Sequence, residues 1–242
     1  RQMCIRDRAR AGRIKEAEEL IDWVYANLLS DSGLLYDGIR LSMAGAVVQK
    51  GMFTYNQGVM IGACLEVGLA LRAHGQREQA TKYFTRVQNL IHAVAKDLAT
   101  TDNVIAGAGG GDGGLFNGIL VRYLADAAVR LPGDNRMNRA AARIARRLVL
   151  ASGEKCWYHR LEVDGLPLFP ADWNDNAQFP QGGSVAQSVG GAVRGSAIKE
   201  RDLSVQLSGW MLMEACARVA DFVATKLENG ESLDSTKPSC PE

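Results

Sequence analysis

Apolar residues recur at intervals of three or four along six segments of the chain, the spacing that places them on one face of an α-helix. In residues 13–29, 76–98 and 135–151, one face is apolar and the opposite face is charged. In residues 59–73, 114–131 and 203–224, apolar or small side chains surround the helix almost completely. The pattern predicts three helices with a solvent-facing side and three that are buried on most of their surface.

The two kinds of helix alternate along the chain, which is typical of an inner and an outer helical layer. No period near 34 or 40 residues recurs, so a helical-repeat solenoid is not indicated. Three unequal connections, at about residues 30–53, 99–113 and 154–201, favour a helical barrel with functional loops. We therefore predict an all-α fold, about half of an (α/α)6 barrel with three inner and three outer helices. Such a half-barrel would expose the apolar flanks of its inner helices and should be poorly soluble.

Outside the helices the sequence carries few structural signals. The segment "YHRLEV", ahead of Asp164 and Gly165, predicts one arm of a short β-hairpin. Residues 1–11 begin without Met, carry no signal peptide and include "MCIRDR", which resembles translated sequencing-adapter read-through. We expect them to be non-native, with the true protein continuing upstream, or else a disordered natural terminus. Residues 229–242 have the composition of a disordered tail, which leaves residues 12–228 as the predicted domain.

Composition excludes several function classes for this 242-residue chain. With 47% hydrophobic and 23% charged residues it is ordinary for a folded protein, and its net charge of +1 indicates no nucleic-acid partner. No apolar run reaches the roughly 18–20 residues of a membrane span. Five cysteines form no CxxC pair, and Cys64 and Cys216 lie in apolar helical runs as predicted core residues. The three histidines are scattered (His74, His92, His159), so we predict neither a metal site nor a cofactor.

Each of the three apolar helices begins with a polar cluster: "TYNQG", "GGGDGGLFNG" and "KERDLSVQ". Inner helices of such a barrel run parallel, so their N-termini, with free N–H groups and positive dipole ends, meet at one rim. Amides, phenols, carboxylates and aromatic rings gathered there suit a sugar, whose hydroxyl groups and apolar ring face need this mixture.

Nine residues are the candidates for binding a substrate at this rim: Asp37, Tyr55, Asn56, Gln57, Asp112, Phe116, Asn117, Arg122 and Tyr123. Helix capping, turn formation or core packing could also explain most of them. For Arg122, the stronger expectation is a buried ion pair with Asp126 that holds the inner helices in register. Asp202 is expected to cap the third inner helix.

Three tryptophans are possible sugar platforms. Trp157 carries no further signal, Trp210 is expected in the core, and Trp173 lies in a loop, "DWNDN", that could border the site.

Two motifs carry a resemblance to a known family. "FTYNQGVMIGACLEV", followed about 60 residues later by "GLFNGILVRYLADAA", resembles glycoside hydrolase family 76, the endo-α-1,6-mannanases and related fungal wall transglycosylase-like proteins. "SGLLYDGI" and "SVQLSGWMLMEAC" also match the family, so the resemblance covers residues 12–225. It implies an (α/α)6 barrel, a mannan polysaccharide or oligosaccharide as partner, and a secreted or cell-envelope location.

The resemblance also implies retaining hydrolysis of α-1,6-mannosidic bonds by an adjacent Asp-Asp pair. This sequence contains no Asp-Asp dipeptide, and in the family the pair lies upstream of the part represented here. We therefore expect the catalytic residues to be missing and this chain to be inactive although its parent is an enzyme.

Two other classes of protein remain open. One is another (α/α)6 sugar enzyme, an epimerase or unsaturated glucuronyl hydrolase, which would need a catalytic His or carboxylate on the inner helices. The other is a non-catalytic helical scaffold that binds a protein partner and has no need of polar clusters at each inner helix.

Overall fold

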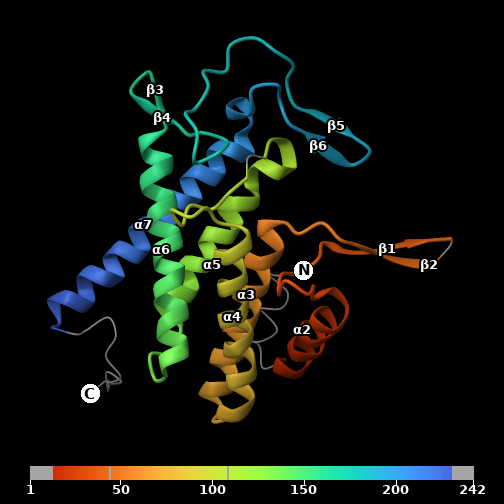
Figure 1. The fold of residues 1–242 in the computed structure, drawn as a ribbon, viewed down its shortest axis with the longest axis vertical. Coiled ribbons are helices and arrows are strands. Elements are labelled where there is room, and N and C mark those ends of the chain that lie inside the picture. The colour runs from red at the N-terminus through yellow and green to blue at the C-terminus, as the bar shows by residue number, and fades with distance from the viewer. Residues whose placement is uncertain (1–12, 44, 108, 231–242) are drawn as a thin grey trace.

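A computed structural model describes residues 13–43, 45–107 and 109–230 of the chain (Figure 1). Within these residues six α-helices account for most of the structure. They are α2 (Ile14–Leu28), α3 (Thr54–Ala73), α4 (Arg77–Asp97), α5 (Phe116–Arg130), α6 (Arg136–Tyr158) and α7 (Leu203–Glu228). The predictions for residues 1–11 and for most of the 229–242 tail lie outside the described residues.

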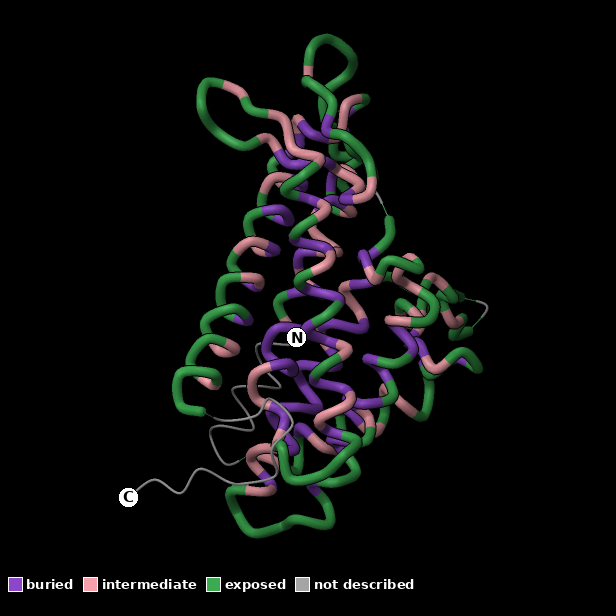
Figure 2. The backbone as a smooth tube through the Cα atoms, turned by 60° about the vertical axis from the view of Figure 1, so that its left-hand side comes forward, coloured by how far each residue is buried: buried purple, intermediate pink, exposed green. Residues whose placement is uncertain are grey.

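The helices form two layers. In the inner layer α5 packs between α3 and α7, while in the outer layer α4 packs against α6. Each outer helix also covers an inner one, α2 and α4 on α3, and α6 on α5 and α7. Buried residues lie along the middle of the helical body, and exposed residues lie along its outside and in its loops (Figure 2). The predicted all-α partial barrel, with three inner and three outer helices, is confirmed.

Glycines allow the inner helices to approach closely. A Cβ atom on Gly58 of α3 would lie 2.7 Å from the Cα atom of Leu120, and one on Gly118 of α5 would lie 2.7 Å from the Cα atom of Ser208. The amide of Gly118 also donates a 2.8 Å hydrogen bond to Ser208 Oγ of α7. Glycine is required at both positions because any larger residue would separate the helices.

Helix α7 departs from the prediction that it is buried on nearly all sides. Its buried residues form a single stripe, Val205, Ser208, Gly209, Leu212, Ala215 and Val219. Trp210 is 67% exposed, so its prediction as a core residue is wrong. The physical reason is that, among the described α-helices, α5 and α6 supply the main packing against α7, and the short helices η1 and η2 contact it as well, so the rest of its surface stays uncovered. The expected exposure of an apolar inner-helix flank is thus confirmed.

A chain of ion pairs links the three inner helices. Arg130 of α5 contacts Glu66 of α3 at 2.6 Å and Asp126 of its own helix at 3.3 Å, and Arg218 of α7 contacts Asp126 at 2.6 Å. The prediction of a buried ion pair between Arg122 and Asp126 is wrong, since Arg122 is exposed. Asp126 is oriented between Arg130 and Arg218 instead, and these arginines hold the helices in register.

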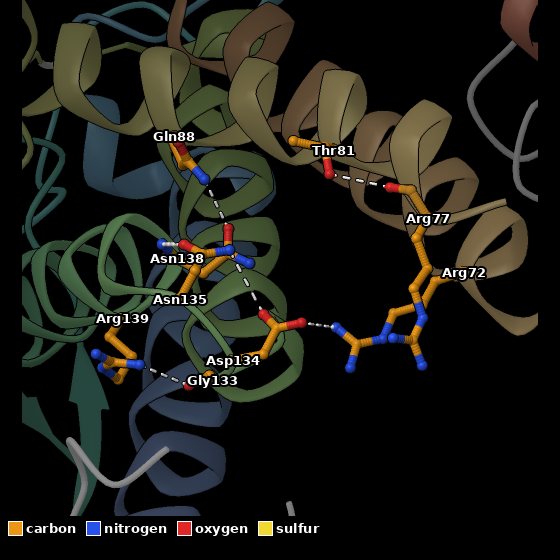
Figure 3. A network of polar contacts seen from close by, with 9 residues as sticks. All are labelled: Arg72, Arg77, Thr81, Gln88, Gly133, Asp134, Asn135, Asn138 and Arg139. Carbon is orange, nitrogen blue, oxygen red and sulfur yellow. Dashed lines mark hydrogen bonds and ion pairs between the residues drawn. The ribbon is translucent and has the colours of Figure 1, made fainter. Parts of the chain in front are cut away.

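A second polar network joins the end of the inner α3 to the start of α6 (Figure 3). Arg72 donates to Asp134 Oδ2 at 2.5 Å, and the buried Gln88 of α4 donates to Asn138 Oδ1 at 2.7 Å. Asn135 caps α6 by accepting a 2.8 Å hydrogen bond from the amide of Asn138. These contacts fix the end of the layers that lies away from the inner-helix starts.

Three antiparallel hairpins interrupt the connections between helices: β1–β2 (Gly38–Ser42 with Gly45–Gln49), β3–β4 (Leu161–Val163 with Leu166–Leu168) and β5–β6 (Gln187–Val189 with Ala192–Arg194). The predicted hairpin is β3–β4, and its turn has positive φ at both Asp164 and Gly165, as a two-residue type I′ turn requires. The other two hairpins were not predicted. Both project to the same side of the helical layers (Figure 1).

Two further predictions can be compared with the described residues. Cys64 is fully buried in the core, and Cys216 is partly buried and packs against it. No helix in the described part of the chain has both the length and the apolar character that crossing a membrane requires.

Candidate functional site

The starts of α3 and α5 lie side by side and are joined by a hydrogen bond. Thr54 Oγ1, in the first turn of α3, donates to Asn117 Oδ1 in the first turn of α5 at 2.8 Å. Asn117 Nδ2 in turn donates to the carbonyl groups of Gly107 at 3.0 Å and Ala106 at 3.4 Å. The predicted residue Asn117 therefore holds the two helix starts and the loop before α5 together.

Asp37 is brought to this place by the unpredicted hairpin β1–β2. Its amide donates to the carbonyl of Gln49, directly beyond the last pair of the hairpin. Its Oδ1 atom accepts hydrogen bonds from the phenol of Tyr55 at 2.5 Å and from Asn56 Nδ2 at 3.3 Å. The predicted residues Asp37, Tyr55 and Asn56 thus form one polar cluster, although Asp37 is well separated from the other two in the sequence.

The environment of Tyr55 raises its pKa to about 12, mainly through burial and then through the hydrogen bond to, and the negative charge of, Asp37. The phenol is therefore a neutral donor at every physiological pH. Because Tyr55 and Asn56 both use Oδ1, the other carboxylate oxygen of Asp37 has no hydrogen-bond partner among the described residues.

Aromatic rings lie next to this carboxylate. The ring of Tyr55 is 4.6 Å from that of Phe116 between centroids, and Phe53 lies 5.4 Å from Phe116 and 6.2 Å from Tyr55. Phe53 is 41% exposed, although most aromatic side chains of this size are buried. Phe53 was not among the predicted site residues. It is the first residue of "FTYNQG", and its place directly before the predicted helix could have marked it as a residue of the same rim.

Gln57 lies beneath the rim and is fully buried. Its Oε1 atom accepts from the amide of Leu35 at 2.8 Å, and its Nε2 atom donates to the carbonyl groups of Leu35 at 2.9 Å and Phe53 at 3.0 Å. All its polar atoms are used by the backbone, so Gln57 fixes the loop that leads to Asp37.

Asp112 and Asp202 order the start of α7. Asp112, in the short helix η1 (Gly111–Leu115), accepts from the amide of Val193 on β6 at 2.8 Å. Asp202 stands at the N-cap position of α7 as predicted, and its backbone carbonyl accepts from the amides of Val205 and Gln206, but its side chain makes no capping hydrogen bond. Its carboxylate turns away and accepts from the amide of Gly111 at 2.7 Å and from the hydroxyl of Ser196 at 2.5 Å.

These hydrogen bonds also explain the acidity of Asp202. Burial opposes ionisation of its carboxyl group, but the hydrogen bonds from Ser196 and Gly111, with the charge of Arg201, outweigh burial and hold its pKa below the ordinary value. Asp202 is therefore ionised at neutral pH and connects η1 and the segment after β6 to the start of α7.

Arg122 and Tyr123 lie more than one turn into α5. Arg122 is exposed, and the partly buried Ile119 lies one turn before it in α5. Tyr123 is partly buried, and its ring occupies the space that a side chain at Gly62 of α3 would need. The structure thus leaves Arg122 accessible and makes Tyr123 part of the α3–α5 contact.

The three tryptophans do not contribute to this cluster. Trp173 is only 1% exposed, so the expectation that it borders the site is wrong, since the loop folds inward at this point. Trp157 is 47% exposed, but the guanidinium group of Arg160 covers its ring at 3.8 Å from the centroid. The described residues include no group of three or more His, Cys, Asp or Glu side chains placed to hold a metal ion.

Comparisons with known proteins point to one family. The sequence profile described as Glycosyl hydrolase family 76 matches residues 11–167 of this chain. No curated protein matches it. Among solved structures, the GH76A α-1,6-mannanase from Salegentibacter sp. HEL1_6 is 30% identical, with a TM-score of 0.62 over 84% of this chain and 51% of that one.

Two further solved structures give the same picture. An inactive variant of the Salegentibacter enzyme, with two consecutive aspartates replaced by alanine, is in complex with α-1,6-mannotetraose; it is 30% identical, with a TM-score of 0.64 over 85% of this chain and 52% of that one. The Lin0763 protein from Listeria innocua is 26% identical, with a TM-score of 0.61 over 85% and 49%. This chain therefore spans about half the length of the structures that it matches.

Proposed function

Because the chain belongs to glycosyl hydrolase family 76, we propose that it forms part of the substrate-binding surface of an α-1,6-mannanase and holds α-1,6-linked mannose units at the starts of α3 and α5. One observation carries the proposal: the carboxylate of Asp37 lies against the Tyr55 phenol, beside the partly exposed rings of Phe53 and Phe116. The structure of a similar mannanase with α-1,6-mannotetraose supports this choice of ligand.

The residues take different parts in binding. Asp37 accepts a hydrogen bond from a sugar hydroxyl through its unpaired oxygen, and Asn56 offers the remaining N–H of its amide to another. The rings of Phe53 and Phe116 contact the apolar face of a mannose ring, as aromatic side chains do in sugar sites. Gln57 and Asn117 position these groups through the backbone. Asp112, Arg122 and Tyr123 continue the surface along η1 and α5.

Cleavage of the glycan requires catalytic groups in addition to the groups that bind it. Retaining hydrolysis needs two carboxyl groups about 5–5.5 Å apart. The sequence contains no two consecutive aspartates, whereas two such residues are replaced in the inactive variant of the similar mannanase. The proposal therefore assigns to this chain the holding of the glycan and not its hydrolysis, and assigns hydrolysis to the longer parent protein.

Isothermal titration of the chain with α-1,6-mannotetraose tests the proposal. We expect Phe116→Ala to weaken binding about threefold to tenfold, since an aromatic contact contributes roughly 0.5–1.5 kcal/mol. Leu166→Lys, on the distant β4, is the matched control and should bind as the unchanged chain does. Equal affinity for cellotetraose, or no effect of Phe116→Ala, would contradict the proposed ligand or the proposed place.

A further inference from the structure

One side of α6 carries a stripe of exposed residues along its whole length. Its members recur at intervals of three, four or seven residues, so they share one face of the helix. The stripe is basic in the first half of α6 and largely apolar toward the end of the helix. This α6 stripe consists of Arg136, Arg143, Arg147, Leu150, Glu154 and Trp157.

The exposed side of α7 carries a second stripe with helical spacing. Its first three members are apolar, and acidic residues alternate with alanines after them. Arg218 lies beside this stripe, but its guanidinium group contacts Asp126 at 2.6 Å, so its charge is directed to α5. This α7 stripe consists of Leu203, Leu207, Trp210, Glu214, Ala217, Asp221, Ala224 and Glu228.

The two stripes border the same groove. It has a volume of about 500 Å³, and the residues that line it include Trp157 of the α6 stripe and Trp210 of the α7 stripe. Farther along both helices, Cys216 Sγ donates to the carbonyl of Val149 at 3.4 Å. Between these two contacts the numbering falls along α6 and rises along α7, so the helices are antiparallel and the apolar ends of the stripes lie together. Figure 1 shows both helices at the edge of the helical body away from α2.

The charged ends of the stripes also lie together. Arg147 comes two residues before Val149, and Asp221 comes five residues after Cys216, so both lie on the side of that contact away from the groove. No hydrogen bond or ion pair within the described part of the chain includes the side chain of Arg147, Asp221 or Glu228. These charges are therefore available to another molecule.

The order of apolar and charged residues selects the partner of each stripe. A helix that pairs with the α7 stripe has to be apolar where α7 begins and basic where α7 ends. The α6 stripe has this order when it runs antiparallel to α7. Two α7 stripes do not fit each other, because a parallel pair opposes acid to acid and an antiparallel pair places acids on apolar side chains.

We propose that the two stripes form a docking surface for a second copy of this chain, with α6 of each copy against α7 of the other. A two-fold axis repeats the contact, so each copy contributes both stripes. The apolar ends remove Trp157 and Trp210 from water, and Arg147 of one copy pairs with Asp221 of the other. The inference goes beyond the proposed function, since neither stripe takes part in the contacts at the starts of α3 and α5.

Sedimentation velocity over a range of concentrations tests the docking surface by a charge exchange. Arg147→Glu and Asp221→Arg should each raise the dimer dissociation constant about tenfold, because the symmetry places each changed charge in the interface twice. The double variant R147E/D221R restores opposite charges in exchanged positions and should dimerise nearly as the unchanged chain does. Lys15→Glu, an exposed charge reversal on the distant α2, is the matched control and should leave dimerisation unchanged.

Two results would overturn the proposal. One is a chain that stays monomeric at every concentration. The other is a double variant that associates no better than the single ones, because unspecific contact between apolar surfaces does not depend on which charges face each other.

Titration with α-1,6-mannotetraose keeps this inference separate from the proposed function. Arg147→Glu should bind the tetraose as the unchanged chain does, since Arg147 lies outside the aromatic cluster. Dimerisation without tetraose binding overturns the proposed function alone, and tetraose binding by a chain that never dimerises overturns the docking surface alone.

Discussion

Tyr55 connects the polar and the aromatic parts of the candidate site. Its phenol donates to Asp37 and its ring contacts that of Phe116. A single side chain therefore positions both the Asp37 carboxylate and the Phe116 ring. The sequence motif "TYNQG" marked these positions as polar but could not show which of them reach a substrate. Gln57, next in the motif, turns inward to the backbone, because the loop at Leu35 needs a partner for its amide and its carbonyl.

The raised pKa of Tyr55 predicts a pH dependence. A phenol whose pKa is raised from its ordinary value near 10 to about 12 stabilises the fold fully below pH 10, and this contribution is lost as the pH rises through 12. We expect the free energy of unfolding to fall less between pH 10 and 12 in Tyr55→Phe than in the unchanged chain. Tyr158→Phe, at a 78% exposed tyrosine, should behave as the unchanged chain does.

At the scale of elements, the periodicity of apolar residues predicted all six helices and their assignment to two layers. Periodicity is informative here because each helix has to bury one stripe or the whole of its surface. Two hairpins, β1–β2 and β5–β6, were missed, since their strands are mostly exposed and show no alternation of buried and exposed residues. The position of Asp37 depends on one of them, so this part of the site could not be placed from the sequence.

Because α5 packs closely on α7, we expect the addition of one methyl group at their contact to lower the free energy of unfolding. In Gly118→Ala the new Cβ atom would lie 2.7 Å from the Cα atom of Ser208, which forces the helices apart. We expect the free energy of unfolding to fall by about 1–3 kcal/mol in urea titrations. Gly113→Ala, where a Cβ atom would meet nothing within 4 Å, is the control. A loss no larger than that of the control would show that the helices are not in close contact.

At the scale of the whole molecule, the sequence motifs identified the family. The sequence did not predict correctly which single residues are buried. The resemblance to family 76 is confirmed over residues 11–167, and the partial barrel follows from it. Trp210 and Trp173 were misplaced because burial depends on which elements pack on a helix or loop, and the apolar character of one residue does not determine that. Arg122 was misplaced for a similar reason, since two other arginines reach Asp126.

The exposed flank of α7 predicts association of the chain with itself. Leu203, Leu207 and Trp210 are 72%, 44% and 67% exposed, and an apolar surface of this kind favours contacts between molecules. We expect Trp210→Ser to lower the apparent mass in light scattering at a given concentration, and Leu166→Lys on β4 to leave it unchanged. A chain that remains monomeric at every concentration would contradict this prediction.

The central claim is that this chain holds an α-1,6-mannan chain without cutting it. One series of proton NMR spectra of the chain with α-1,6-mannotetraose tests both halves, because saturation transfer reports contact and the anomeric signals report hydrolysis. The account predicts saturation transfer from the protein to the tetraose, and anomeric signals that do not change over days. No saturation transfer, or the growth of new reducing-end signals, would contradict it.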